Sequence, residues 1–251
     1  MLLGIDHLVI AVRDVAAAEG ALARSIGLVC TGGGRHEAMG TYNRLAFLGD
    51  SYIELIGVFD RSLVLSSTTF AVGNAALAVL EAGSEGLATY ALASDDVAAD
   101  VTALHVTGPP IGSPVPGYRV RPDGDVVRWI TAFPELGPAG PPFLIEHEYA
   151  GAEWGDEARA VRGAFRHPGG GRVRVTSLEL PVPDVAVGVL EHAAVLGLDL
   201  EGGTTRVGDH VVALRTAEPG SLPVVQLAGE AGTPALDEEL LGVRWVREPR
   251  Q

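Results

Sequence analysis

Apolar strands that lead into Asp-Val-Ala recur three times along the chain. The three segments are HLVIAVRDVAAAEGAL from His7, TYALASDDVAADVTAL from Thr89 and SLELPVPDVAVGVLEH from Ser177. Aspartate at this point is a favoured helix N-cap, and the alanine-rich stretch that follows is typical of a helix. Each copy closes on a second apolar strand, YIELIGV, FLIEHEY or PVVQLAG. The pattern therefore predicts three copies of one module.

The segments between these strands complete the module. In the first copy, residues 5–12 form a strand, and a helix follows that ends at Gly27. Further strands are expected from Leu28, Thr41 and Ser51, the last two joined by a Gly-Asp turn. The unit is βαβββ. We expect an α+β fold in which repeated βαβββ modules form a curved open barrel, with a third, degenerate module.

Changes in composition divide the chain into six parts. They are a first βαβββ module at 1–58, a helical insert at 59–85, a second module at 86–148, a linker at 149–171, the third degenerate module at 172–230 and a C-terminal tail at 231–251. The third module alone is small and leaves apolar area exposed. We expect it to pack on the other two modules or on a second chain, which would make a homodimer.

Composition excludes several classes of function. The formal charge of −14 argues against nucleic acid or an anionic membrane as a partner, because basic patches supply that affinity. The chain has no lysine, which excludes pyridoxal-phosphate chemistry, and it has neither a P-loop nor a G-x-G-x-x-G motif for a nucleotide. The N-terminus resembles no signal peptide, and no apolar run is long enough to span a bilayer. We therefore expect a cytoplasmic protein that binds a small molecule.

Polar residues interrupt the apolar strands at positions that match between copies. The matched pairs are His7 with Glu54, Thr89 with Glu146, and Ser177 with Gln226. A carboxylate inside an apolar strand is costly to bury, so it must be protonated, hydrogen-bonded or bound to a cation. The first pair has the chemistry of a metal site, while the third has lost it. Each residue taken alone could also be a satisfied polar group in a core.

Two other segments carry candidate site residues. The glycine-rich segment GGGRHEAMGTYN places His36 and Asn43 just before a strand, where loops often line sites. Arg121 could hold a carboxylate of a ligand, with Trp129 in the next strand as a further contact. The alternative for Arg121 is a solvated arginine paired with surface acids.

Five motifs resemble the vicinal oxygen chelate superfamily, and within it the glyoxalase-like group. They are GIDHLVIAVRDV, GGRHEAMGTYN, LGDSYIELIGV, RPDGDVVRW and PFLIEHE, and they span about residues 4–148. The resemblance implies a cavity between the first two modules, with a divalent metal (Mn, Fe, Mg, Ni or Zn) held by His7, Glu54 and Glu146. Thr89 departs from the pattern at the fourth ligand position. The group usually has tryptophan at the position of His147.

The resemblance implies a metal-dependent enzyme of lyase, isomerase or dioxygenase type that acts on a small oxygenated metabolite. Glu146 and His36 are the expected catalytic residues, and Asn43, Arg121 and Trp129 are expected to contact the substrate. One alternative is a metal-free binding or sequestering protein of the bleomycin-resistance type that uses the same cavity. Another is a scaffold in which both carboxylates are simply hydrogen-bonded.

Overall fold

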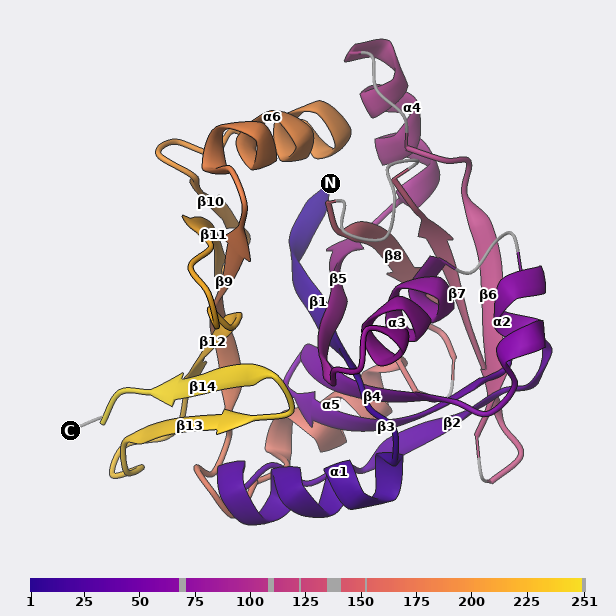
Figure 1. Ribbon diagram of the computed structural model, residues 1–251. Helices are drawn as coiled ribbons and strands as arrows, with labels where there is room; N and C mark the ends of the chain where they lie inside the picture. Colours follow the sequence, from indigo (N-terminus) through magenta and orange to yellow (C-terminus); the bar gives the residue numbers. More distant parts are fainter. Residues whose placement is uncertain (68–70, 108–110, 122, 135–140, 152, 250–251) are drawn as a thin grey trace.

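The structure is a computed structural model that describes residues 1–67, 71–107, 111–121, 123–134, 141–151 and 153–249. It contains a closed eight-stranded barrel and a six-stranded sheet beside it (Figure 1). The first module comprises β1 (Leu2–Ala11), α1 (Val15–Ala21), η1 (Leu22–Ile26), β2 (Gly32–His36), η2 (Glu37–Met39), β3 (Thr41–Leu48) and β4 (Ser51–Val58). The second comprises β5 (Gly86–Ser94), α4 (Val97–Thr107), β6 (Val115–Val120), β7 (Val126–Ala132) and β8 (Phe143–His147).

The two modules form the barrel together, in the strand order β1-β4-β3-β2-β6-β7-β8-β5. They meet along an antiparallel β1–β5 pairing and close through β2–β6, where Arg35 is paired with Val120. The expected α+β class and the repeated βαβββ barrel are confirmed. Because the modules close on each other, the inner faces of all eight strands surround one space.

The third module forms the second sheet and continues to the end of the described chain. It contains β9 (Arg174–Val182), α6 (Val185–Leu196), β10 (Thr204–Val207), β11 (His210–Thr216), β12 (Val224–Ala228), β13 (Leu236–Leu240) and β14 (Val243–Arg247). Residues 231–251 were expected to be a tail, but β13 and β14 form a hairpin whose second strand pairs with β12. The hairpin therefore extends this sheet.

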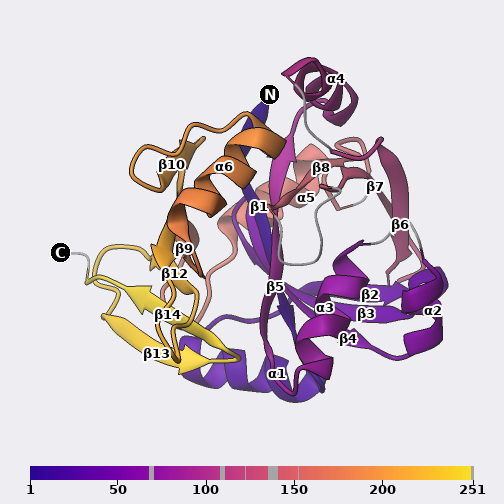
Figure 2. The ribbon, with the colours of Figure 1, turned by 45° about the horizontal axis from the view of Figure 1, so that its top comes forward.

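The second sheet packs on the barrel within one chain (Figure 2). One continuous apolar cluster contains Ile5 and Leu8 of β1 together with Leu178, Val225 and Trp245 of the second sheet, all 0 to 2% exposed. Burial of this size is the main favourable term in folding. The third module thus covers its apolar face with the outer surface of the barrel.

An irregularity in β1 changes which side chains face the barrel interior. The pairing of β1 with β5 shifts register between Ile5 and His7, so Asp6 is an extra residue in β1. Such a bulge reverses the alternation of side chains beyond it. The sequence pattern placed Ile5 and His7 on one face, but Ile5 packs in the core against the second sheet, whereas His7 lines the barrel. The bulge is what lets Asp6 and His7 lie buried side by side.

Strand β2 begins at Gly32, whereas the sequence pattern predicted a strand from Leu28. The glycines make this pairing feasible, because Gly33 has φ 138° and a Cβ atom there would lie 2.4 Å from the Asn43 carbonyl oxygen. The first part of the segment expected to be a loop, Gly32–His36, is therefore a barrel strand. It brings His36 to the barrel interior.

The helices begin as the Asp-Val-Ala motif predicts. Asp14 accepts hydrogen bonds from Ala16 N and Ala17 N, and Asp184 accepts equivalent bonds at the start of α6. Gly27 adopts φ 76° at the end of η1, as expected for a helix C-terminus. These caps fix where each helix leaves its strand.

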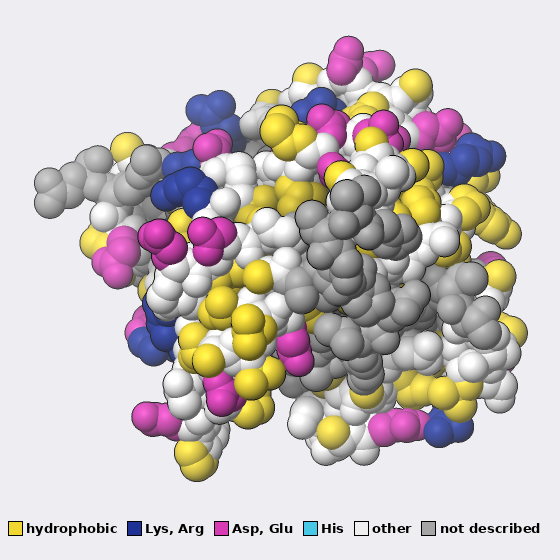
Figure 3. All heavy atoms as spheres, turned by 90° about the horizontal axis from the view of Figure 1, so that it is seen from above, with side chains coloured by type: hydrophobic (Ala, Val, Ile, Leu, Met, Phe, Trp, Pro, Cys, Tyr) yellow, Lys and Arg dark blue, Asp and Glu magenta, His cyan; other side chains and the backbone are white. Residues whose placement is uncertain are grey.

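The two segments between modules also contain helices. The insert at 59–85 forms α2 (Arg61–Ser66) and α3 (Ala71–Glu81), and the linker at 149–171 contains α5 (Asp156–Ala164). Within the described residues, no helix has both the length and the apolar character needed to cross a membrane. One face of the molecule carries acidic, arginine and hydrophobic side chains interspersed with one another (Figure 3).

Candidate functional site

A small cavity of about 40 Å³ lies inside the barrel. Most of its lining side chains come from barrel strands, and the others come from α3, from the residue after β7 and from the segment before α5. The lining residues are His7, His36, Asn43, Leu45, Tyr52, Glu54, Val72, Arg119, Val127, Trp129, Thr131, Phe133, Phe143, Ile145, His147, Glu153 and Trp154. The cavity therefore combines an aromatic wall with several buried charged groups, as ligand sites do.

Asp6 lies between two histidines from different modules. His7 Nδ1–H donates to Asp6 Oδ1 at 2.6 Å, and His147 Nε2–H donates to Asp6 Oδ2 at 2.9 Å. Burial alone would raise the pKa of Asp6, but the charges and hydrogen bonds of His147 and His7 hold this pKa well below its usual range. An ionised Asp6 fixes the His7 proton on Nδ1. In the neutral form of the ring, the Nε2 lone pair then faces the cavity side.

Glu54 lies beside that lone pair and is held in place by Asn43. Asn43 Oδ1 accepts from the Gly34 backbone N–H at 2.9 Å, so its Nδ2 is the donor to Glu54 Oε1 at 2.6 Å. The second carboxylate oxygen lies 3.5 Å from His7 Nε2. That separation is too long for a good hydrogen bond, so both atoms are available to an acidic hydrogen of a ligand that approaches from the cavity.

Aromatic rings hold both histidines in position. His7 stacks on Tyr52 with ring centroids 4.4 Å apart, and His147 stacks on Trp154 at 3.7 Å. Burial, with nearby negative charge, raises the pKa of the Tyr52 hydroxyl well above its usual value, so it is a neutral phenol. The imidazole rings therefore have little freedom to rotate.

Glu146 does not lie in the cavity, contrary to the sequence expectation. Its carboxylate accepts a hydrogen bond from Val97 N at 2.9 Å, at the start of α4. The neighbouring residues Ile145 and His147 line the cavity instead, because successive side chains of a strand point to opposite faces. The sequence alignment of the modules matched Glu146 to Glu54, but Glu146 lies on the outer face of β8. Its expected roles as metal ligand and catalytic residue are corrected accordingly.

The donor set does not fit a resident divalent metal. Of the three expected ligands, His7 Nε2 and Glu54 Oε2 lie 3.5 Å apart, Glu54 Oε1 already accepts from Asn43, and Glu146 lies outside the cavity lining. Zinc sites have three or four protein ligands, and the part of the chain that the structure describes holds no group of three His, Cys, Asp or Glu side chains able to bind a metal ion. Thr89, which occupies the fourth ligand position of the family pattern, is not among the cavity-lining residues.

His36 enters the cavity from β2 as a neutral side chain. Its Nδ1 lies 2.8 Å from Thr41 Oγ1, and its ring meets Trp129 edge-on at 5.9 Å. Burial lowers the pKa of His36 to about 4, with a smaller lowering by Arg119, against the opposing effect of Glu54. His36 and Trp129 thus form part of the pocket wall, and a catalytic role for His36 stays a prediction.

The low pKa of His36 predicts a loss of stability in acid. The unfolded state binds a proton near pH 6.5, whereas the folded state resists it until about pH 4. Stability is thus present above pH 6.5 and is lost as pH falls toward 4, by about 2 kcal/mol between pH 7.5 and pH 5. Chemical unfolding at both pH values checks this, with the His36→Gln variant as comparison.

The variant removes only the contribution of His36. Burial also lowers the pKa values of His167, His192 and His210, which act in the same direction in both proteins. We expect the variant to lose about 2 kcal/mol less than the wild type over this range. Equal losses in the two proteins would contradict the assignment.

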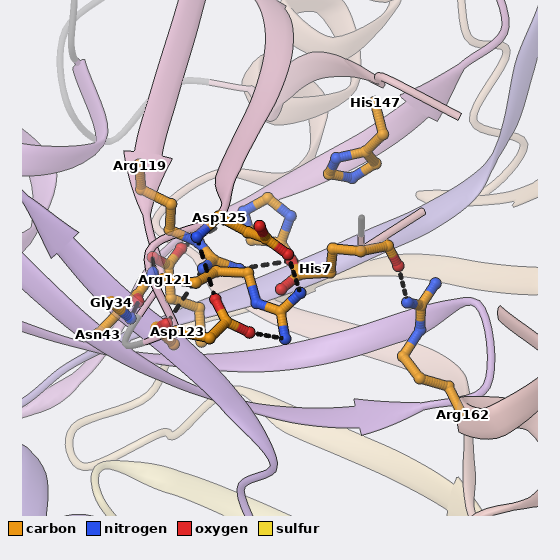
Figure 4. A network of polar contacts seen from close by, with 12 residues as sticks. His7, Gly34, Asn43, Arg119, Arg121, Asp123, Asp125, His147 and Arg162 are labelled. Carbon is orange, nitrogen blue, oxygen red and sulfur yellow. Dashed lines mark hydrogen bonds and ion pairs between the residues drawn. The ribbon is translucent and has the colours of Figure 1, made fainter. Parts of the chain in front are cut away.

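Arg121 is not the arginine that reaches the cavity. It lies beyond the end of β6, where it pairs with Asp123 at 2.9 Å and lies 3.9 Å from Asp125 (Figure 4). Arg119, two residues earlier and 3% exposed, is the one that lines the cavity. The alternative reading of Arg121 as an arginine paired with surface acids is the one that the structure supports.

Four residues of the site were missed in the sequence. Asp6 adjoins His7 in an otherwise apolar strand, and that charge was a usable signal. Arg119 alternates with exposed residues along β6, so strand parity could have selected it. Glu153 and Trp154 precede α5 in a polar segment that had the composition of a linker, and no local pattern marks them as cavity residues.

The fold and cavity define a class, a βαβββ-repeat barrel with a polar internal site. A sequence model of the glyoxalase-like domain family matches residues 5–195. The chain belongs to this family, within the vicinal oxygen chelate superfamily. No curated protein matches it.

Solved structures resemble the chain to different extents. A hypothetical protein from Staphylococcus aureus aligns over 99% of this chain and 100% of its own, with a TM-score of 0.80 and 16% identity. A variant of the Streptomyces coelicolor methylmalonyl-CoA epimerase, in complex with 2-nitronate-propionyl-CoA, aligns over 61% of this chain and 99% of its own, with a TM-score of 0.45 and 20% identity. The Mycobacterium tuberculosis methylmalonyl-CoA epimerase aligns over 57% of this chain and 86% of its own, with a TM-score of 0.42 and 19% identity. The first of these shares the whole fold, including the second sheet.

Proposed function

We propose that the protein is an enzyme of isomerase or lyase type that moves a proton on a small oxygenated metabolite inside the barrel. The observation that carries this proposal is the buried Asp6–His7 pair, in which His7 Nε2 lies beside Glu54. A histidine oriented by a carboxylate is a common general base. The donor set does not fit a metal, so we derive no step through one.

Each group has a separate task in this proposal. His7 Nε2 accepts the proton from an acidic C–H or O–H of the ligand, and Asp6 stabilises the imidazolium that forms. The Glu54 carboxylate, held by Asn43, lies next to the same proton and adds to that stabilisation. The aromatic wall excludes water, which strengthens these charge interactions.

Exchange of hydrogen for deuterium tests the proposal without knowledge of the full reaction. The protein is incubated in D₂O with small 2-hydroxy and 2-oxo carboxylates and with neutral hydroxyketones, and loss of C–H signals is followed by NMR. We expect exchange on some members of the panel that a chelator does not change. Glu54→Gln should slow it about tenfold, because glutamine still accepts from Asn43 but carries no charge.

The outcomes separate the enzyme from a metal-free binding protein. The small cavity, in which Glu54 is already hydrogen-bonded, favours the binding protein as second candidate. Ligands that stabilise the protein without any exchange would support that candidate and contradict the enzyme. Exchange at the same rate in the wild type and in Glu54→Gln would remove Glu54 from the mechanism.

A further inference from the structure

Arg119 carries a positive charge that is buried in the cavity wall. It is 3% exposed, and its Nη1 donates to the Gly33 carbonyl oxygen at 3.1 Å. Its Nη2 pairs with the carboxylate of Glu153. A buried guanidinium without a counter-charge is costly, so Glu153 is the group that makes the burial of Arg119 tolerable.

Glu153 does not belong to the barrel. It lies after β8 and before α5, and the next residue, Trp154, stacks on His147. Barrel strands are held by backbone pairing on both sides, whereas segments outside the strands can move without breaking such ladders. Glu153 and Trp154 are therefore lining side chains that no strand pairing holds. Arg162 of α5 contacts both of them, through a hydrogen bond to the Glu153 carbonyl oxygen and through its guanidinium over the Trp154 ring.

A ligand carboxylate and the Glu153 side chain would compete for one place in the cavity, because Glu153 lines the cavity and its carboxylate already pairs with Arg119. Displacement of Glu153 makes room for the ligand, and it also leaves Arg119 without its counter-charge.

The charge of Arg119 then selects the ligand. A neutral molecule in the place of Glu153 would leave a buried guanidinium unpaired, whereas a carboxylate restores the pair with the planar geometry that guanidinium prefers. Arg119 and His7 line the same cavity from different strands (Figure 4). A short acid could thus bind Arg119 at one end and present its reacting hydrogen to His7.

We infer that the ligand of the barrel is a small carboxylate, which takes Arg119 from Glu153 and displaces Glu153 and Trp154 from the cavity. Glu153 is in this sense an internal substitute for the carboxylate of the ligand. The inference rests on the proposed function for the reaction that follows binding, but binding itself can be measured separately.

The Glu153→Ala variant tests the inference with propionate and its neutral counterpart propionamide. A tethered carboxylate competes at an effective concentration in the millimolar range or above, so its removal should tighten propionate binding roughly tenfold or more by calorimetry. Propionamide should bind neither protein measurably. Glu157→Ala, which removes an exposed acid from the first turn of α5, is the matched control and should bind as the wild type does. Equal affinities for propionate in the wild type and both variants would overturn the inference. Binding of propionamide with the same affinity as propionate would overturn it as well.

The wild type gives a second test that does not depend on the folding of Glu153→Ala. Displacement of Trp154 from His147 should change tryptophan fluorescence on titration with propionate, and the Trp154→Phe variant should lose this change. Propionamide should leave the signal unaltered. A signal that both ligands change equally, or that neither changes, would contradict the displacement.

The proposed function and this inference can fail separately. Carboxylate binding without any deuterium exchange would remove the enzyme and leave the carboxylate site. Exchange confined to neutral hydroxyketones would support the enzyme and overturn the carboxylate site.

Discussion

Replacing His7 by glutamine is expected to slow deuterium exchange on the responsive metabolite about 10²–10⁴-fold, the usual contribution of a positioned general base. Glutamine fills similar space but cannot accept a proton near neutral pH. Asp6 keeps its hydrogen bond from His147 in the variant, so the Asp6 carboxylate still has a buried partner. NMR exchange rates on both proteins, measured at equal concentration, give the ratio.

The control for this loss is a histidine outside the barrel. His192 is buried in α6, where its Nδ1 lies 2.9 Å from the Gly188 carbonyl oxygen, and it is not among the cavity-lining residues. His192→Gln should exchange at the wild-type rate. A loss of less than threefold in His7→Gln, with the fold intact, would show that His7 is not the base.

Replacing Trp245 by alanine is expected to lower the free energy of unfolding by about 3–5 kcal/mol, the range for a fully buried aromatic side chain. Trp245 in β14 is 0% exposed, and its indole N–H donates to the Leu240 carbonyl oxygen at 3.0 Å. It lies in the apolar cluster shared by the second sheet and the barrel. Denaturant unfolding, followed by circular dichroism, gives the loss.

Two further variants define what the Trp245 loss means. Trp245→Phe keeps most of the apolar volume and should lose less, whereas Val187→Ala changes a half-exposed side chain of α6 and should change stability by less than about 0.5 kcal/mol. Because the core is shared, we expect barrel and sheet to unfold in one transition. Two separate transitions in the wild type would contradict the shared core.

Much of the fold could be predicted from the sequence, because its signals are local. The N-caps Asp14 and Asp184 mark the starts of α1 and α6, and the repeated apolar strands define the modules. The pairing of His7 with Glu54 was also predictable, since both belong to one module and to strands that pair directly. Local spacing was enough for each of these features.

The rest of the site depends on relations that local spacing does not contain. Glu146 and His147 are adjacent in β8, and only the register of the closed barrel decides which of them faces inward. Glu153 meets Arg119 from a segment outside both modules. Hydrophobic alternation predicts two faces for a strand, but it does not say which face encloses the cavity when both are buried.

The bulge at Asp6 links the chemistry of the site to the assembly of the chain. On its two sides, Ile5 points into the core shared with the second sheet, while His7 points into the barrel. Deleting Asp6 would rotate the start of β1 by half a turn, so that the cavity would gain an isoleucine and the shared core would lose one. Replacing Asp6 removes a carboxylate from the site, whereas shortening β1 at this point would also disturb the contact between the barrel and the second sheet.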